Sequence, residues 1–165
     1  MVLKAVNLSL NYGYSAESAQ SYAWCSYILG SVLQEYKASY EFGMLSLKLA
    51  DKFNNLTQKC KAFDVFSNFA SVWVQDLKLT NDLNSIAYQA ALASGELAFA
   101  GYNLVHQLFN SFYQGVPLED LIKKSHDFIS FTEKIGHQYA SDALLGAQLA
   151  ILNLAGMTNE DMNWQ

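Results

Sequence analysis

Hydrophobic residues along this chain recur every three to four positions, which is the spacing of one face of an α-helix. The clearest example is an apolar series made of Leu97, Gly101, Leu104, Leu108 and Phe112. A second, mostly aromatic series follows the same period on an adjacent face: Phe99, Tyr102, His106, Phe109 and Tyr113. A helix on the outside of a globule needs only one such face. Two faces therefore predict neighbours on two sides, as in stacked helical hairpins.

The rest of the chain repeats this helical pattern, and no segment alternates apolar and polar residues as a strand does. Helix pairs recur about every 35–45 residues, the period of a helical-repeat array. Short connectors make neighbouring helices antiparallel. We therefore predict an all-α fold of seven to eight helices, arranged as antiparallel hairpins stacked into a superhelix or bundle. Helix breaks are expected near Gly13, Asn54, Gly95, Gly115, Gly136 and Gly156.

Three local expectations follow from the same periodicity. One long helix is expected from Thr57 to about Leu77, with Trp73 still in register, and the next helix is expected to start at Thr80 or Asn81. The first helix, residues 2–12, has no partner before it, and residues 158–161 look like the start of a further helix. No linker divides the chain. We therefore expect one helical-repeat domain over residues 1–165 that is an excised piece of a longer protein.

Composition narrows the class of protein. Hydrophobic residues make up 52% of the chain and charged residues 15%, which argues against disorder and predicts apolar surface for other parts of a protein to cover. The net charge is −5 and every basic residue is a lysine, so binding to nucleic acid is not expected. No uncharged run is long enough for a membrane span. Cys25 and Cys60 are isolated, which favours a reduced, cytoplasmic protein.

The break at Ser94–Leu97, followed by Ala100, resembles the turn and small helix-crossing residues of tetratricopeptide repeats in degenerate form. Two longer segments, Asn7–Leu49 and Ser94–Leu121, resemble the helical region of very large, cyanobacterial-type signalling proteins. The turns Ser9–Gly13 and Gly95–Tyr102 carry the most particular features. The resemblance implies that serine/threonine kinase, AAA ATPase, GAF and histidine kinase modules accompany this region. None of their catalytic motifs is present in this chain.

No residue pattern indicates catalysis. The phosphate-binding loop, the kinase loops, GxSxG and HExxH are all absent. The carboxylate pairs Glu119–Asp120 and Glu160–Asp161 stand at expected helix starts, where the helix dipole already favours them. The histidines fall on three separate helices: His106, His126 and His137. We therefore expect neither an enzyme nor a metal site in this segment, and no cofactor.

Aromatic residues are the best candidates for binding. Some of them lie near a second helix face that could line a groove for a peptide or a neighbouring domain: Trp24, Tyr27, Trp73, Tyr102, His106 and Phe109. The alternative is plain packing between helices. For function, we expect a non-catalytic scaffold or regulatory module that mediates protein or interdomain contacts in a signal-transduction kinase. The alternative is a small-ligand sensor with an apolar pocket anchored by His106 or a tyrosine hydroxyl. We also expect self-association through exposed end helices, for example through Leu3, Val6 and Leu10.

Overall fold

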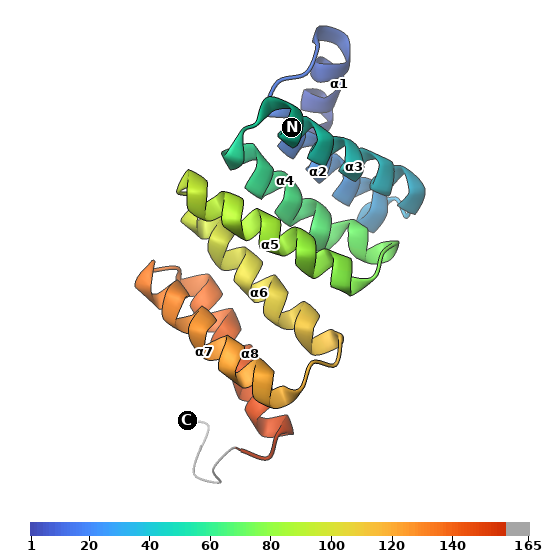
Figure 1. The fold of residues 1–165 in the computed structure, drawn as a ribbon. Helices are drawn as coiled ribbons and strands as arrows, with labels where there is room; N and C mark the ends of the chain where they lie inside the picture. The colour runs from blue at the N-terminus through green and yellow to red at the C-terminus, as the bar shows by residue number, and fades with distance from the viewer. Residues whose placement is uncertain (158–165) are drawn as a thin grey trace.

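The computed structural model describes residues 1–157, which contain eight α-helices and no strand (Figure 1). The α-helices are α1 (Val2–Tyr12), α2 (Ser18–Tyr27), α3 (Tyr36–Phe53), α4 (Leu56–Phe69), α5 (Leu77–Ser94), α6 (Leu97–Tyr113), α7 (Leu118–Lys134) and α8 (Gln138–Leu154). Two short elements interrupt them, a π-helical turn η1 (Ile28–Val32) and a 3-10 turn η2 (Ser71–Trp73). The all-α prediction is confirmed. No helix of this range is long and apolar enough to cross a membrane.

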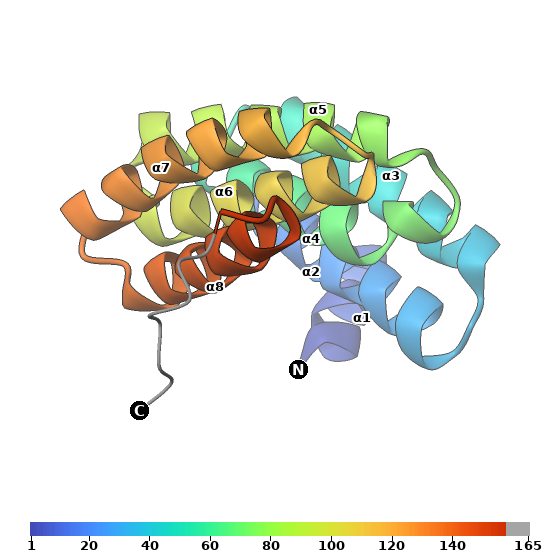
Figure 2. The ribbon, with the colours of Figure 1, turned by 90° about the horizontal axis from the view of Figure 1, so that it is seen from below.

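The helices form two layers. Helices α3, α5 and α7 lie in one layer, and α2, α4, α6 and α8 lie in the other (Figure 2). Consecutive helices pack as hairpins, α2 with α3, α4 with α5, and α6 with α7. Within the second layer α2 contacts α4, α4 contacts α6, and α6 contacts α8, while α1 packs on α2 at the end of the stack. The predicted stack of antiparallel hairpins is therefore confirmed.

The predicted helix breaks are also confirmed, because each lies at or within two residues of a helix end. The break between α5 and α6 shows why. Gly95 has a φ of 75°, a left-handed conformation that a residue with a Cβ rarely adopts. In this conformation the chain turns back, and the Glu96 N–H donates to the carbonyl of Ala91 at 2.9 Å. This tight turn sets α6 antiparallel against α5.

The prediction of one helix from Thr57 to Leu77 is wrong. Helix α4 ends at Phe69, η2 follows, and α5 already begins at Leu77. The Ser71 hydroxyl donates back to the Ser67 carbonyl at 2.8 Å, and the Asp76 carboxylate caps α5 by accepting from the Lys78 N–H at 2.7 Å. These local side-chain bonds compensate for the lost helical bonds, so the chain turns although the apolar spacing continues through Trp73.

The core of the described residues is divided into three clusters. The largest lies between α1, α2, α3 and α4 and contains Tyr22 and Phe66. A second lies between α6, α7 and α8 around Leu108. A small one, built from Cys60 and alanines, joins them across α4, α5 and α6. In the first helix only Val6 of the expected apolar series is buried, whereas Leu3 and Leu10 are exposed. The expected helix at residues 158–161 lies outside the described residues.

Candidate functional site

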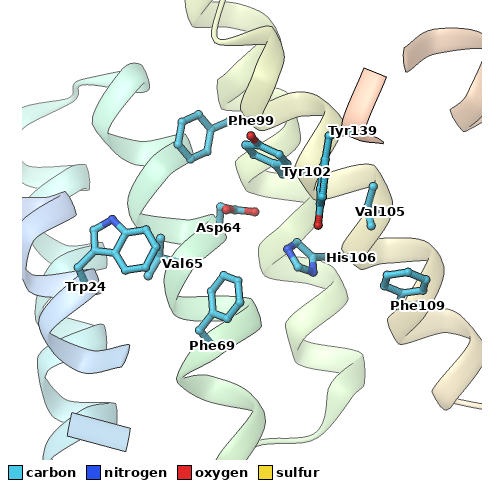
Figure 3. A pocket seen from close by; sticks show the side chains of 10 residues that line it. All are labelled: Trp24, Asp64, Val65, Phe69, Phe99, Tyr102, Val105, His106, Phe109 and Tyr139. Atoms are coloured by element: carbon cyan, nitrogen blue, oxygen red, sulfur yellow. The ribbon is translucent and has the colours of Figure 1, made fainter. Parts of the chain in front are cut away.

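The second helix layer carries a pocket of about 460 Å³ (Figure 3). Four successive helices of that layer contribute to its wall, so the stacking of the hairpins creates it. The lining residues are Trp24 of α2; Asp64, Val65 and Phe69 of α4; Phe99, Tyr102, Val105, His106 and Phe109 of α6; and Tyr139 of α8. We call this the aromatic pocket.

The rings of the aromatic pocket contact one another in two groups. On the α2 side, Trp24 stacks on Phe69 at 6.4 Å between ring centroids, and Phe69 makes a T-shaped contact with His106 at 5.6 Å. On the α8 side, Tyr102 packs edge-to-face against Phe99 and Tyr139, at 5.8 Å in each case. Such edge-to-face pairs are the favoured geometry of aromatic rings. The rings therefore hold one another in place while part of their surface stays open.

Asp64 is the only carboxylate among the residues that line this pocket, and only 4% of its surface is exposed. Figure 3 shows its carboxyl group extending from α4 toward the side formed by Tyr102 and His106. One oxygen, Oδ1, accepts a hydrogen bond from the Asn68 side-chain amide at 3.3 Å. Among the described residues, Oδ2 accepts no hydrogen bond and no cation forms an ion pair with this carboxylate. Burial raises the pKa of Asp64 to about 7, because the charged form loses its hydration.

His106 faces the same space from α6. Burial lowers its pKa to about 4, again because the charged form is desolvated. Its ring makes a T-shaped contact with Phe69, and neither ring nitrogen forms a hydrogen bond with the described residues. At neutral pH the imidazole is therefore uncharged and offers the pocket one N–H donor and one acceptor.

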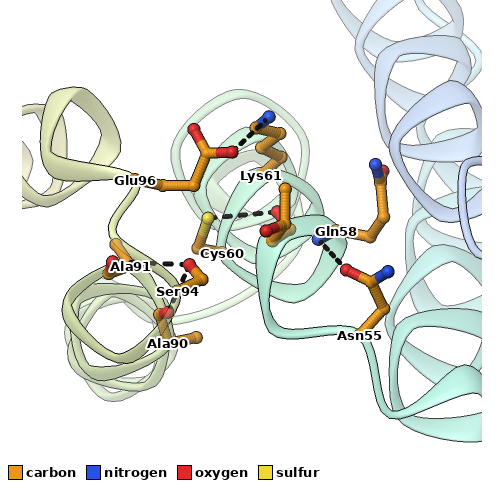
Figure 4. A network of polar contacts seen from close by, with 9 residues as sticks. Asn55, Gln58, Cys60, Lys61, Ala90, Ala91, Ser94 and Glu96 are labelled. Carbon is orange, nitrogen blue, oxygen red and sulfur yellow. Dashed lines mark hydrogen bonds and ion pairs between the residues drawn. The ribbon is translucent and has the colours of Figure 1, made fainter.

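The nearest basic side chain is already neutralised by a partner. Lys61, one turn before Asp64 on α4, pairs with Glu96 at 2.9 Å (Figure 4). Its ammonium group lies 5.5 Å from the centroid of Phe99. Glu96 stands just before α6, so the ion pair ties the start of α6 to α4. The lysine therefore rests on Phe99, a ring that lines the aromatic pocket.

The structure brings together most of the residues proposed from sequence. Four of the six line the aromatic pocket: Trp24, Tyr102, His106 and Phe109. Tyr27 lies behind them, in edge contact with Trp24 at 5.8 Å and with Phe69 at 5.6 Å. Trp73 does not join them. It belongs to η2, lies against Tyr36 at 5.7 Å and is 55% exposed, because α4 ends before the position where helical register would have placed it.

The sequence predicts that both apolar faces of α6 are buried against neighbouring helices, and the structure differs from this prediction. Leu104 and Leu108 are buried, with 3% and 0% exposure. In the aromatic series, by contrast, Phe109 is 37% exposed and Tyr113 is 71% exposed, and the three further members are partly buried and line the aromatic pocket. Helix α6 contacts α4, α5, α7 and α8. Its aliphatic and small residues form the buried part of these contacts, and its aromatic rings contact α4 and α8 around the pocket.

Sequence reasoning did not propose the other six lining residues as site residues: Asp64, Val65, Phe69, Phe99, Val105 and Tyr139. A signal was present for Asp64, because a single carboxylate stands inside the apolar run from Ala62 to Phe66. Charged residues are rarely buried without a partner, so such a position marks a site. Nothing in the sequence signalled Tyr139, which reaches the pocket only because α8 packs on α6.

The described residues contain no group of three or more His, Cys, Asp or Glu side chains that is arranged to hold a metal ion. Cys25 and Cys60 are both buried and free. Burial is the main reason that the pKa of Cys60 rises to about 11, so its thiol stays protonated and unreactive. What the pocket offers chemically is ring surface, one buried carboxylate and one neutral imidazole. This set is suited to binding.

Comparison with known proteins gives no further assignment. No protein-family model matches the chain, and no curated protein or solved structure is significantly similar to it.

Proposed function

We propose that this chain is a non-catalytic helical-repeat module that binds a polypeptide segment, of a partner protein or of a neighbouring domain, in the aromatic pocket. The observation that carries the proposal is the exposure of ring surface on one face of four successive helices, including Trp24, Phe109 and Tyr139. Half-exposed aromatic rings that surround a hollow are typical of the anchoring points of protein interfaces. The inner layer of a helical-repeat stack is also where such modules bind extended peptides.

The proposed context is a large signalling protein of the kinase-containing type that the sequence resembles. Its support is the resemblance of Asn7–Leu49 and Ser94–Leu121, which together form α2, α3, α6 and the connections around them. In that context the module would mediate contacts between domains or with a partner. Catalysis would belong to other modules of the protein.

Selection from a random peptide library displayed on phage tests the binding function. Peptides selected on the wild-type protein should bind at least about tenfold more weakly to the Phe109→Ala variant, because Phe109 supplies ring surface to the pocket. Phe53→Ala is the matched control. Phe53 is 36% exposed, compared with 37% for Phe109, but it lies at the end of α3 outside the pocket.

The proposal fails if no peptide is selected, or if the two alanine variants weaken binding equally. In both cases the aromatic pocket is not the binding surface for a polypeptide.

A second candidate function is supported by the size of the pocket. A volume of about 460 Å³ beside His106 lies within the range of small-molecule sites, roughly 300–1,000 Å³. A sensor of this kind would bind a compact apolar compound with one polar group directed at His106. Thermal denaturation with a library of such compounds tests it: a rise in Tm that disappears in His106→Leu, without selection of any peptide, favours the sensor.

A further inference from the structure

The Asp64 carboxyl group lacks a counterion among the described residues. A buried carboxylate is strongly disfavoured unless cations or hydrogen-bond donors compensate for its lost hydration. The only donor that reaches it among the described residues is the Asn68 amide, at the long distance of 3.3 Å. The free oxygen, Oδ2, belongs to a side chain that is 96% buried and lines an open pocket. The geometry leaves room for a donor that arrives with the occupant of the pocket.

The walls around Asp64 favour a positively charged donor. Cations bind over the faces of Trp, Tyr and Phe rings, and the attraction grows when the site is desolvated. The rings of Trp24, Phe69 and Tyr102 line the same pocket as the carboxylate. The chain already shows this contact at the edge of the pocket, where the Lys61 ammonium lies 5.5 Å from the Phe99 centroid.

No other charge in the pocket opposes a cation. Helix α2 contributes Trp24, α8 contributes Tyr139, and α6 contributes His106, whose lowered pKa keeps it neutral at pH 7. The charge of Lys61 is balanced by Glu96 at 2.9 Å. The chain as a whole has a net charge of −5, which adds a weak attraction at long range.

The hydrogen bond from Asn68 also bears on which cation fits. Because Oδ1 is used, Asp64 presents one free oxygen, which suits the single point charge of an ammonium group. A guanidinium group forms its best contact with two free oxygens in a fork. A lysine also has a stem of four methylene groups, which can lie along the exposed ring surfaces while its head reaches the carboxylate.

We propose that the occupant of the aromatic pocket is the side chain of a lysine from a bound peptide, whose ammonium group lies among the rings and pairs with the Asp64 carboxylate. The proposal rests on the proposed function, since it names the part of the polypeptide that the pocket holds. The buried carboxylate supplies specificity for charge, and the rings supply apolar contact area. A free small amine would use the same chemistry, and the experiment separates it from a peptide.

The test uses peptides selected from the random library on the wild-type protein. We expect them to share one lysine position. A blocked synthetic peptide of the selected sequence is compared by calorimetry with versions in which norleucine or arginine replaces that lysine. Norleucine keeps the apolar stem and removes the charge, so it should bind to the wild-type protein at least about tenfold more weakly. The arginine version should bind with intermediate affinity.

Two variants locate the effect. In Asp64→Asn, which keeps the shape of the side chain and an oxygen for Asn68, the lysine and norleucine peptides should bind equally. Asp127→Asn is the matched control, because it removes the same charge from the exposed surface of α7 in the other helix layer. The lysine preference should persist in that variant.

Equal binding of the lysine and norleucine peptides to the wild-type protein overturns the lysine proposal and leaves the peptide-binding function standing. Binding of n-butylammonium as tight as that of the peptide also overturns it, because the pocket is then a site for a free amine. Failure to select any peptide is the different result that removes the proposed function itself. The comparison on the wild-type protein needs no variant, so it remains decisive even if Asp64→Asn does not fold.

Discussion

The two apolar faces of α6 follow the same helical period and nonetheless have opposite environments. One face carries Gly101, Leu104 and Leu108, which are all buried, and Leu108 packs in the cluster that α6 forms with α7 and α8. The other face carries Tyr102, His106 and Phe109, which line the aromatic pocket and remain partly exposed. Hydrophobic periodicity alone therefore does not distinguish a core face from a binding face.

Residue shape explains the difference. A Cβ placed on Gly101 would come within 2.9 Å of the His137 ring and 3.2 Å of the Ala140 side chain, so the helices approach closely on this face because it has a glycine. On the other face, aromatic rings of neighbouring helices contact one another, Phe69 of α4 with His106 and Tyr102 with Tyr139 of α8, and these rings line the hollow of about 460 Å³. Small and aliphatic residues close an interface, whereas aromatic rings that support one another can hold a pocket open.

The largest expected effect comes from the core face. Leu108 is completely buried, so Leu108→Ala should lower the free energy of unfolding by about 2–5 kcal/mol, through lost burial and the cavity left behind. Leu97, in the same series but 42% exposed, is the control. Leu97→Ala should cost less than about 1 kcal/mol in urea denaturation. Similar losses for both variants would contradict the assignment of Leu108 to the core.

Two groups that line the aromatic pocket, Asp64 and His106, should make the free energy of unfolding depend on pH in opposite directions. The folded protein raises the pKa of Asp64 from 3.8 to about 7, so it binds more protons than the unfolded chain, and the contribution of Asp64 falls as pH rises through that window. It lowers the pKa of His106 from 6.5 to about 4, so here the unfolded chain binds more protons and the contribution rises with pH. In the wild-type protein the two effects largely cancel between pH 4 and 6.5.

Replacing either Asp64 or His106 should reveal the pH dependence that the remaining group causes. His106→Phe should become less stable as pH rises from 4.5 to 6.5, by up to about 1.4 kcal/mol per pH unit, which is the limit for one proton. Asp64→Asn should show the opposite slope. Urea unfolding at several pH values measures both slopes, and the double variant, which lacks both groups, is the control. A flat profile in His106→Phe would show that Asp64 is not desolvated as its position indicates.

These two faces also show how far sequence reasoning can reach. The fold was predictable because its determinants are local: the period of the apolar residues, and breaks such as Gly95, whose left-handed conformation favours glycine. The position of Trp73 could not be predicted in the same way, because the apolar spacing continues past Ala70 and only the capping residue Asp76 signals the turn. Trp24, Tyr102, His106 and Phe109 were found from their helical spacing. Asp64 was marked only as a lone carboxylate in an apolar run, and that it faces His106 and Tyr139 depends on contacts among α4, α6 and α8 that no local pattern encodes.

A smaller effect is expected at the glycines. Gly101→Ala should destabilise the protein by up to about 2 kcal/mol, because overpacking against His137 and Ala140 outweighs the gain in helix propensity. Gly146 of α8 is the matched control, since a Cβ there would meet nothing within 4 Å. Gly146→Ala should stabilise the protein by about 0.5–1 kcal/mol. If both substitutions stabilise the protein, the close approach of α6 and α8 at Gly101 does not exist in solution.

The smallest expected effect on stability is the one that tests the comparison most directly. Phe109 is larger than Leu104, so a packed core would lose at least as much from Phe109→Ala as from Leu104→Ala. Because Phe109 is 37% exposed and Leu104 only 3%, we expect instead a loss below about 1 kcal/mol for Phe109→Ala and about 2–5 kcal/mol for Leu104→Ala. Chemical denaturation of the two variants measures the difference between their free energies of unfolding, when both curves are fitted with the same dependence on denaturant concentration. Equal and large losses would mean that both faces of α6 are core and that the aromatic pocket closes in solution. A loss confined to Leu104→Ala, together with the weaker peptide binding expected of Phe109→Ala, would instead show that the ring surface of α6 contributes to recognition more than to stability.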